Sequence, residues 1–355
     1  MGVNPKKSAK PLLFNKTNKD ELKKKLEKDA TKRTTLSFYR YVKIENPETL
    51  RNELYLQWSA LGVMGRIYLA HEGINAQLSV PTSNFETFKK ELYAKEKFTD
   101  VPFKIGVEDD GKSFYKLIIK VKEKIVADGL DDSTFDPANT GTHLNAEEFN
   151  KEMAKPETIV VDMRNHYESE VGRFENAVCP DADTFREELQ MVKSLLKGKE
   201  ERQILLYCTG GIRCEKASAY LKHQGFKKTF QLQGGIINYA HEVKEKKLES
   251  KFKGKNFVFD ERVGERITDD VISQCHQCGK TSDEHNNCKN DACHLLFIQC
   301  EECAEKYDGC CTTKCQEFIK LPIEEQRKLR RQDKRTDNLA VYKSRLRPKL
   351  KEILT

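Results

Sequence analysis

Long apolar runs are absent from this chain of 355 residues. A helix that crosses a bilayer needs about 20 consecutive apolar residues, and no segment approaches that length. The N-terminal region is rich in lysine and lacks the apolar core of a secretory signal. These absences predict a soluble, cytoplasmic protein with no membrane association. Hydrophobic residues still make up 37% of the chain, which is enough for compact cores, and the length predicts two or three domains.

Several sequence patterns that bind redox cofactors are missing as well. The chain carries no 2-His-1-carboxylate iron motif, no flavin or nicotinamide fingerprint and no haem motif. It also shows no internal repeat, which excludes a solenoid or propeller. Any reaction that this protein catalyses must therefore be argued from other residues.

Charge is distributed unevenly along the chain, whose formal net charge is +7. Residues 1–33 carry a net +7 and residues 321–355 a net +6, so the body between them is acidic at −6. Two basic ends favour contact with a polyanion such as a nucleic acid. Solvated tails give the same pattern, and charge alone does not choose between the two. We expect a basic flexible arm at 1–33 and a basic tail at 321–355.

The segment 34–127 predicts a ferredoxin-like domain with the order β-α-β-β-α-β. Apolar alternation predicts strands, and proline at a segment start predicts helices. The expected strands are 35–42, 65–70, 75–80, 103–107 and 115–126, with helices at 47–60 and after Pro81. Polar residues occupy the turn between the second and third strands, namely His71, Glu72 and Asn75. They either line a cleft or form a simple turn.

After a linker at 128–143, rich in Asp, Thr, Gly and Pro, the segment 144–248 alternates strands with helices. This alternation predicts a parallel α/β sheet covered on both faces. Predicted strands lie at 158–162, 203–207 and 229–232, and predicted helices at 185–196 and 214–224. Sites in such folds form where the strands end at their carboxyl termini.

A cysteine follows the buried-type strand 204–207 directly. The loop that it opens consists of Cys208, Thr209, Gly210, Gly211, Ile212 and Arg213. The two glycines let the loop curl so that its N–H groups point inward at a helix N-terminus, which stabilises an anion. Arg213 adds positive charge. The arrangement predicts a nucleophilic Cys208 thiolate or a persulfide built on it, whereas a free cysteine elsewhere usually packs as a small hydrophobe.

Three further residues are candidates for supporting that loop. Asp162 and Arg164 end their strand at the same sheet edge, where a salt bridge between them would brace the loop. The alternative is a surface pair of little energetic consequence. Cys214 lies six residues after Cys208. It either resolves an oxidised Cys208 as a disulfide or packs as an inert helix residue.

Nine of the twelve cysteines lie between residues 275 and 315. In a cytoplasmic protein such clustering predicts metal binding in the region 249–320. Two C-x-x-C pairs, Cys275 with Cys278 and Cys300 with Cys303, suit one tetrahedral zinc ion. A second ion would draw on Cys288, Cys293, Cys315 and either Cys310 or Cys311. We predict Cys310 as the fourth ligand. Interleaved pairings and iron–sulfur ligation fit the spacing too.

Several motifs in the segment 144–248 resemble the rhodanese family. They are Val160-Val161-Asp162-Met163-Arg164 with Tyr167-Glu168, Gly172-Arg173-Phe174-Glu175-Asn176-Ala177, Leu206-Tyr207-Cys208 with Arg213, and Leu232-Gln233-Gly234-Gly235-Ile236. The resemblance implies a rhodanese fold with Cys208 as its reactive residue. Taken alone it would imply a sulfurtransferase.

The chain as a whole resembles the bacterial tRNA uridine hydroxylase family over about residues 34–320. The motifs that carry this are His71-Glu72-Gly73-Ile74-Asn75, Tyr207-Cys208-Thr209-Gly210-Gly211-Ile212-Arg213-Cys214-Glu215-Lys216 and Gly254-Lys255-Asn256-Phe257-Val258-Phe259-Asp260-Glu261-Arg262.

That resemblance implies an enzyme that uses dioxygen, with an unknown electron donor, to hydroxylate carbon 5 of the wobble uridine. It implies tRNA, bound at its anticodon loop, as the partner, with His71, Glu72 and Asn75 as candidates to line the RNA cleft. A persulfide-carrying sulfurtransferase and a non-catalytic RNA-binding adaptor stay as alternatives.

Overall fold

The computed structural model describes residues 13, 15, 17–130 and 135–332. The chain divides into two compact units, Met1–Val126 with Asp260–Arg262, and Ala127–Phe259 with Val263–Thr355. Residues 1–12, 14 and 16 of the predicted arm and 333–355 of the predicted tail lie outside the described residues. The described parts contain α1 (Lys19–Lys28) and α11 (Ile323–Gln332). Within the described ranges, no helix has both the length and the apolar character that a membrane crossing requires.

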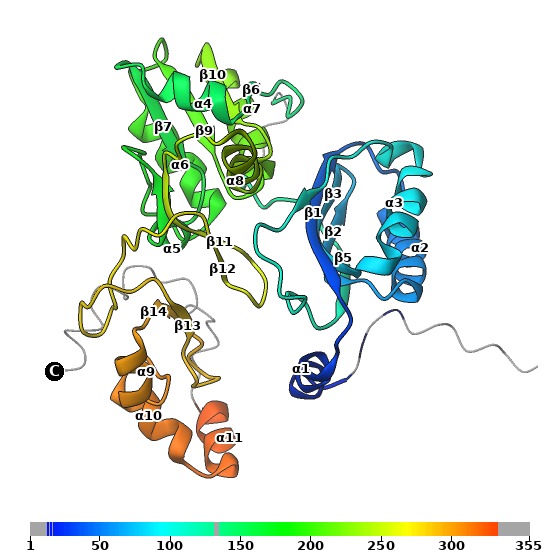
Figure 1. Ribbon diagram of the computed structural model, residues 1–355, viewed down its shortest axis with the longest axis vertical. Helices are drawn as coiled ribbons and strands as arrows, with labels where there is room; N and C mark the ends of the chain where they lie inside the picture. The colour runs from blue at the N-terminus through cyan, green and yellow to red at the C-terminus, as the bar shows by residue number, and fades with distance from the viewer. Residues whose placement is uncertain (1–12, 14, 16, 131–134, 333–355) are drawn as a thin grey trace, which may run out of the picture. The chain divides into compact units, whose positions relative to one another are not determined.

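The first unit is built on a sheet with the strand order β4-β1-β3-β2-β5 (Figure 1). Its strands are β1 (Arg33–Tyr41), β2 (Met64–Ala70), β3 (Gly73–Pro81), β4 (Lys104–Ile105) and β5 (Leu117–Val121). Two of its helices are α2 (Pro47–Ala60), between β1 and β2, and α3 (Phe85–Tyr93), which lies between two short 3-10 turns, Thr82–Asn84 and Glu96–Phe98. The predicted ferredoxin-like order is confirmed, and β5 adds a strand parallel to β2.

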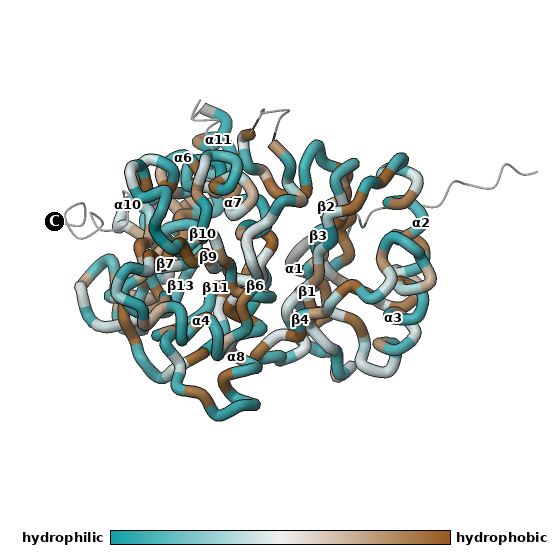
Figure 2. Tube along the Cα trace, turned by 90° about the horizontal axis from the view of Figure 1, so that it is seen from above, coloured by the Kyte–Doolittle hydropathy of each residue, from teal (hydrophilic) through white to brown (hydrophobic). Residues whose placement is uncertain are grey.

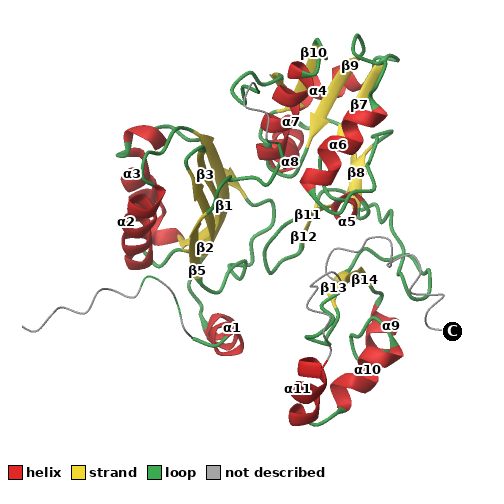
Figure 3. Ribbon diagram, turned by 180° about the vertical axis from the view of Figure 1, so that it is seen from behind, coloured by secondary structure: helices red, strands yellow, loops and turns green. Residues whose placement is uncertain are grey.

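Both α2 and α3 cover one face of this sheet (Figure 3). Successive side chains of a strand point to opposite faces, and the apolar ones point toward the helices. Phe38 on β1 contacts the rings of Trp58 on α2 and Phe88 on α3, with centroids 6.4 and 6.5 Å away. The side chains on the opposite face of β1 are more polar, and those of Ser37, Tyr39 and Tyr41 are only partly buried.

The second unit contains a parallel sheet with the order β6-β10-β9-β7. Its strands are β6 (Thr142–Leu144), β7 (Thr158–Asp162), β9 (Gln203–Tyr207) and β10 (Lys228–Leu232). Its helices are α4 (Ala146–Met153), α5 (His166–Ser169), α6 (Phe185–Leu195), α7 (Ile212–His223) and α8 (Gly235–Lys246). The run Ile204–Tyr207 is fully buried, as expected for a central strand covered on both faces.

The same unit continues into smaller sheets. An antiparallel sheet joins β8 (Gly172–Phe174), β11 (Phe252–Phe257) and β12 (Gly264–Arg266). The cysteine-rich region follows with β13 (His285–Asn287), β14 (Leu296–Ile298), α9 (Glu301–Lys306) and α10 (Thr313–Lys320). The trace over α11 is mostly hydrophilic (Figure 2), in keeping with its sequence IEEQRKLRRQ. The cysteine-rich region has a small core of its own, in which Leu295 and Phe297 pack with buried cysteines.

Candidate active site and metal centres

Cys208 lies between the end of β9 and the start of α7, at the carboxyl edge of the parallel sheet. Gly211 precedes α7 with a φ of 95°, a left-handed conformation that glycine adopts without the steric penalty of a Cβ. This turn reverses the chain within three residues of Cys208. The loop therefore places its sulfur at the N-terminus of a helix of 12 residues, where the helix dipole favours negative charge.

Hydrogen-bond donors surround the Cys208 sulfur. The Gly211 N–H donates to it at 3.1 Å, and the Arg213 and Cys214 amides and the Cys214 thiol also donate. The side chain is 0% exposed, and burial on its own would raise the pKa. The donors and the Arg213 charge outweigh burial and lower the Cys208 pKa from 9.0 to about 6. The sulfur is therefore a thiolate at neutral pH.

The carbonyl groups of the loop are turned away from the sulfur by the start of α8. Ile236 N–H donates to the Cys208 carbonyl at 3.0 Å, and Ile237 N–H donates to the Thr209 carbonyl at 3.2 Å. Gly235 makes this approach possible, because a Cβ there would lie 2.5 Å from the Cys208 carbonyl oxygen. The inward-facing amides predicted from Gly210 and Gly211 thus depend on a second helix that holds the opposite side of the loop.

Arg213 forms a buried ion pair with Glu168 on α5. Its Nη1 and Nη2 atoms donate to the two carboxylate oxygens at 2.6 and 2.8 Å. Thr209 joins them, because its hydroxyl donates to Glu168 at 3.1 Å. The guanidinium stays near the Cys208 thiolate and lowers the Cys208 pKa, but its own hydrogen bonds serve to fix both ends of the loop to α5.

The Asp162–Arg164 pair is fully buried, with both side chains 0% exposed. Arg164 donates to both Asp162 oxygens, at 2.8 and 2.7 Å, and to the Gly172 carbonyl at 2.6 Å. Asp162 also accepts a hydrogen bond at 2.7 Å from the hydroxyl of Tyr207, the residue immediately before Cys208. This contact links the Asp162–Arg164 pair to the residue that precedes the reactive loop.

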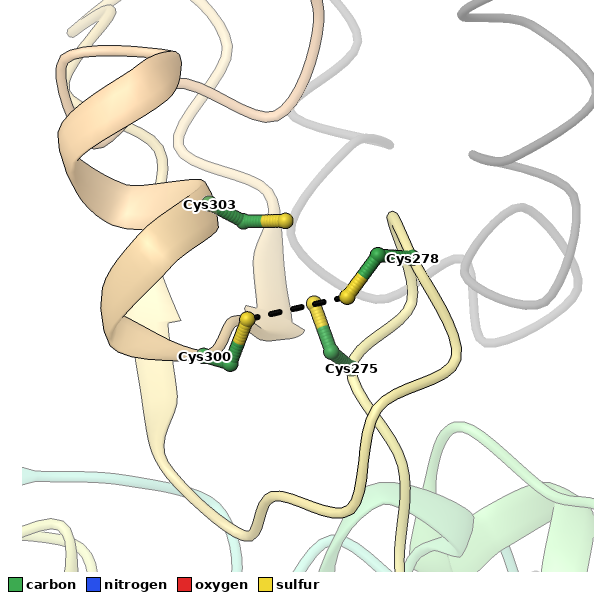
Figure 4. A group of neighbouring side chains, drawn as sticks. All are labelled: Cys275, Cys278, Cys300 and Cys303. Carbon is green, nitrogen blue, oxygen red and sulfur yellow. Dashed lines mark hydrogen bonds between the residues drawn. The ribbon is translucent and has the colours of Figure 1, made fainter.

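Four sulfurs of the cysteine-rich region converge on one point (Figure 4). They belong to Cys275, Cys278, Cys300 and Cys303, and all lie within 4.8 Å of one another. Cys278 and Cys300 are 3.6 Å apart. Sulfurs bound about 2.3 Å from one zinc ion in a tetrahedron lie about 3.8 Å apart. These residues therefore fit a single tetrahedral ion, which would supply charge that holds two chain segments together.

A second group consists of Cys288, Cys293, Cys311 and Cys315, again within 4.8 Å of one another. Cys311 is 3.7 Å from Cys293 and 3.8 Å from Cys315, measured between the sulfurs. Cys310 lies outside both groups, so the choice of Cys310 over Cys311 is wrong for this geometry. The Cys310 carbonyl instead accepts hydrogen bonds from Gln277 and Gln299. The sulfur of the next residue, Cys311, belongs to the second group.

Family models match three segments in chain order. The UPF0176 acylphosphatase like domain matches residues 33–125, the Rhodanese-like domain 145–242 and the Rhodanase C-terminal model 253–316. A protein of Leptospira interrogans named tRNA uridine(34) hydroxylase is 59% identical over 341 residues, covering 96% of this chain and 93% of that protein. The chain belongs to the tRNA uridine(34) hydroxylase family. Members so named from Photorhabdus laumondii and Yersinia pestis are 54% and 56% identical, over 89% and 90% of this chain and 90% of each relative.

The polar turn of this family member is engaged with its own backbone. His71 Nδ1 lies 2.9 Å from the Ile44 carbonyl. The Glu72 carboxylate accepts from the Ile125 N–H at 2.7 Å, and the Asn75 amide donates to the Ile125 carbonyl at 3.3 Å. The three side chains thus fasten two segments of the first unit beside the β2–β3 hairpin.

Two buried carboxyl groups beside the loop escaped the sequence reasoning. Glu168 belongs to a motif that the sequence analysis identified, but nothing in the sequence indicated that Glu168 pairs with Arg213. Glu188 on α6 is 0% exposed, and neither of its carboxyl oxygens has a hydrogen-bond partner among the described residues. Burial raises its pKa well above 4.5, and the Cys208 charge contributes. Nothing in the surrounding sequence distinguishes Glu188 from its exposed neighbours.

Proposed function

We propose that this protein hydroxylates carbon 5 of uridine 34 in tRNA and that Cys208 is its reactive residue. The single observation that carries the assignment is a buried thiolate, held by amides at a helix N-terminus, in a chain of the tRNA uridine(34) hydroxylase family. Dioxygen is the oxidant that we propose for this reaction: one of its oxygen atoms enters the C5–OH group and the other leaves as water, with two electrons and two protons from a cellular donor. The cytoplasm is the location that we propose.

The chemistry follows from what a thiolate does to a uracil ring. Addition of the Cys208 sulfur to carbon 6 makes carbon 5 electron-rich, so that carbon 5 can accept oxygen. A uridine in the anticodon loop is unpaired, which reduces the cost of presenting it to a pocket. Because the Cys208 side chain is 0% exposed, the covering residues must move before the ring reaches the sulfur.

Zinc is the ion that we propose for both cysteine groups, in a structural role. Each group has four sulfur donors and leaves no position for a substrate, which is typical of structural zinc. A multi-iron cluster would occupy the space between its cysteines and hold the sulfurs further apart than 4.8 Å allows for four residues. Metal analysis of protein purified without oxygen tests this assignment directly.

The decisive experiment compares tRNA from cells that carry the wild-type gene, a deletion, or a Cys208→Ser variant. We expect nucleoside mass spectrometry to find 5-hydroxyuridine only with the wild-type gene, in a strain that has no second pathway. Cys179→Ser is the matched control. Burial raises the Cys179 pKa to about 12, so this thiol is not activated and its loss should leave the product unchanged.

A sulfurtransferase is the second candidate, because the same amides would stabilise a persulfide on Cys208. It predicts thiosulfate or mercaptopyruvate turnover by the purified protein. Full 5-hydroxyuridine in the deletion strain, together with such turnover, would replace the hydroxylase assignment with this one. An RNA-binding adaptor, in contrast, would keep its function in the Cys208→Ser variant.

A further inference from the structure

The sheet of the first unit has a second face, opposite α2 and α3, whose composition the fold does not explain. Register fixes which side chains share that face, because directly paired residues on neighbouring strands point to the same side. One row across the strands is Tyr39, Asn75, Tyr68 and Lys120. A second row is Ser37, Gln77, Arg66 and Ile118. Neither row contains an acidic residue.

Aromatic rings lie near the centre of this face. Tyr39, Tyr41 and Tyr68 are each partly exposed, although alternation would permit small polar residues there. Tyr39 and Tyr41 contact each other edge-to-face, with centroids 6.3 Å apart. At the β1 start, Thr35 bonds to Asp109 and Ser113, and in the middle row Asn75 donates to the Ile125 carbonyl. Loops therefore cover two parts of this face, and the tyrosines lie partly exposed beside them.

Positive charge accompanies these rings. The Lys104 ammonium lies 4.2 Å from the Tyr39 ring centroid, but Lys104 is buried and serves to hold that ring in place. Arg66 and Lys120 on β2 and β5 are exposed, and register places both on the same face. Aromatic rings flanked by cations on a four- or five-stranded sheet suit unpaired nucleotides, because bases stack on the rings while phosphates meet the cations.

We propose that this tyrosine face, defined by Tyr39, Tyr41, Tyr68, Arg66 and Lys120, binds single-stranded RNA. The inference rests on the proposed function and deepens it, since the occupant would be the unpaired anticodon loop of the substrate. The absence of carboxylates from the two rows favours a polyanion over a peptide or a second copy of the chain. Because stacking needs no base-specific contacts, one face could bind anticodon loops of different sequence.

The test measures binding of an anticodon stem-loop RNA to full-length protein by fluorescence anisotropy. Tyr39→Leu and Tyr68→Leu keep an apolar side chain but remove the ring, and each should weaken binding by roughly fivefold to a hundredfold. Tyr39→Phe and Tyr68→Phe keep the ring and should bind as wild type. Lys120→Gln should lower the salt dependence of binding, whereas Lys90→Gln, an exposed lysine on α3, should not.

Activity measurements separate this proposal from the hydroxylase assignment. The leucine variants should raise the KM for tRNA and leave kcat nearly unchanged. Unchanged binding in variants of a protein that still makes 5-hydroxyuridine would overturn the RNA face and leave the function standing. Lower thermal stability and lower kcat with unchanged affinity would show that the face packs against another part of the chain, which also overturns it.

Discussion

The reactive loop and the cysteine-rich region use the same side chain in opposite ways. Around Cys208, the negative charge of one sulfur is balanced by N–H donors, an adjacent thiol and a guanidinium. In the cysteine-rich region, eight sulfurs form two groups of four that lie close enough to share one ion each. Backbone amides stabilise a thiolate without consuming its lone pairs, so it stays a nucleophile, whereas a coordinated ion occupies them.

The two sites differ in how far apart along the chain their residues lie. The loop holds its sulfur where a strand ends and a helix begins, so the donors come from consecutive residues of one turn. Each cysteine group draws on chain segments that are far apart, such as residues 275–278 and 300–303. One arrangement tunes a reaction, and the other adds to a small hydrophobic core that contains Leu295 and Phe297.

The largest effect that would test this contrast comes from removing one sulfur of a group. Cys300→Ser should reduce bound metal from two ions to one per chain, because a group of four cannot hold its ion with three thiolates as tightly. Structural zinc contributes about 10 kcal/mol or more to such folds, so the region should become sensitive to protease. Cys310→Ser, outside both groups, should retain both ions by elemental analysis. Equal loss in the two variants would contradict the assignment.

A second prediction contrasts a buried ion pair with an exposed one. Asp162→Ala leaves the Arg164 guanidinium 0% exposed and unpaired, which should lower the free energy of unfolding by about 3–5 kcal/mol. Glu157→Ala removes the partner of Arg202 on the surface and should leave the urea midpoint nearly unchanged. If the Asp162–Tyr207 hydrogen bond helps to position Cys208, Asp162→Ala should also raise the Cys208 pKa. A thiolate titration of the variant measures this second effect.

The pH dependence of the loop gives a third prediction. The Cys208 pKa is lowered from 9.0 to about 6, so the thiolate forms as pH rises through about 6 and is lost below it. Thiolate absorbance of the wild type minus that of Cys208→Ser should show this midpoint. Cys214→Ala removes a donor to the thiolate and should move the midpoint upward. A midpoint near that of a free thiol, about 8.5, would show that the amides do not hold the sulfur.

The smallest expected effect concerns Glu188, the buried carboxyl without a hydrogen-bond partner. Its folded pKa is raised well above 4.5 by burial, so at neutral pH the folded state must either bind a proton or bury a charge, and both cost stability. Glu188→Gln removes that requirement and should stabilise the protein at pH 7, with a gain that disappears as pH falls below about 4.5. Urea unfolding at both pH values checks the sign. A variant that is less stable at pH 7 would show that the carboxylate has a favourable role.

Sequence reasoning located the loop because its chemistry is local. A strand, two glycines and a helix start are contiguous, and their consequences for Cys208 follow from short-range geometry. It could not choose between Cys310 and Cys311, since one step along a turn rotates the side chain and only the packing of Gln277 and Gln299 decides the direction. Glu168 and Glu188 were out of reach as partners for a related reason, because the loop meets them through tertiary contacts across at least 20 residues of chain.

The close packing of Gly235 against the loop limits how this site could be transplanted. A designer who moved only the stretch from Cys208 to Arg213 into another α/β scaffold would leave the Cys208 and Thr209 carbonyls without the amides of Ile236 and Ile237. Those oxygens could then rotate inward and repel the sulfur. A transplanted site would need the first turns of both α7 and α8. It would also need Gly235, because any larger side chain there would collide with the backbone of the loop.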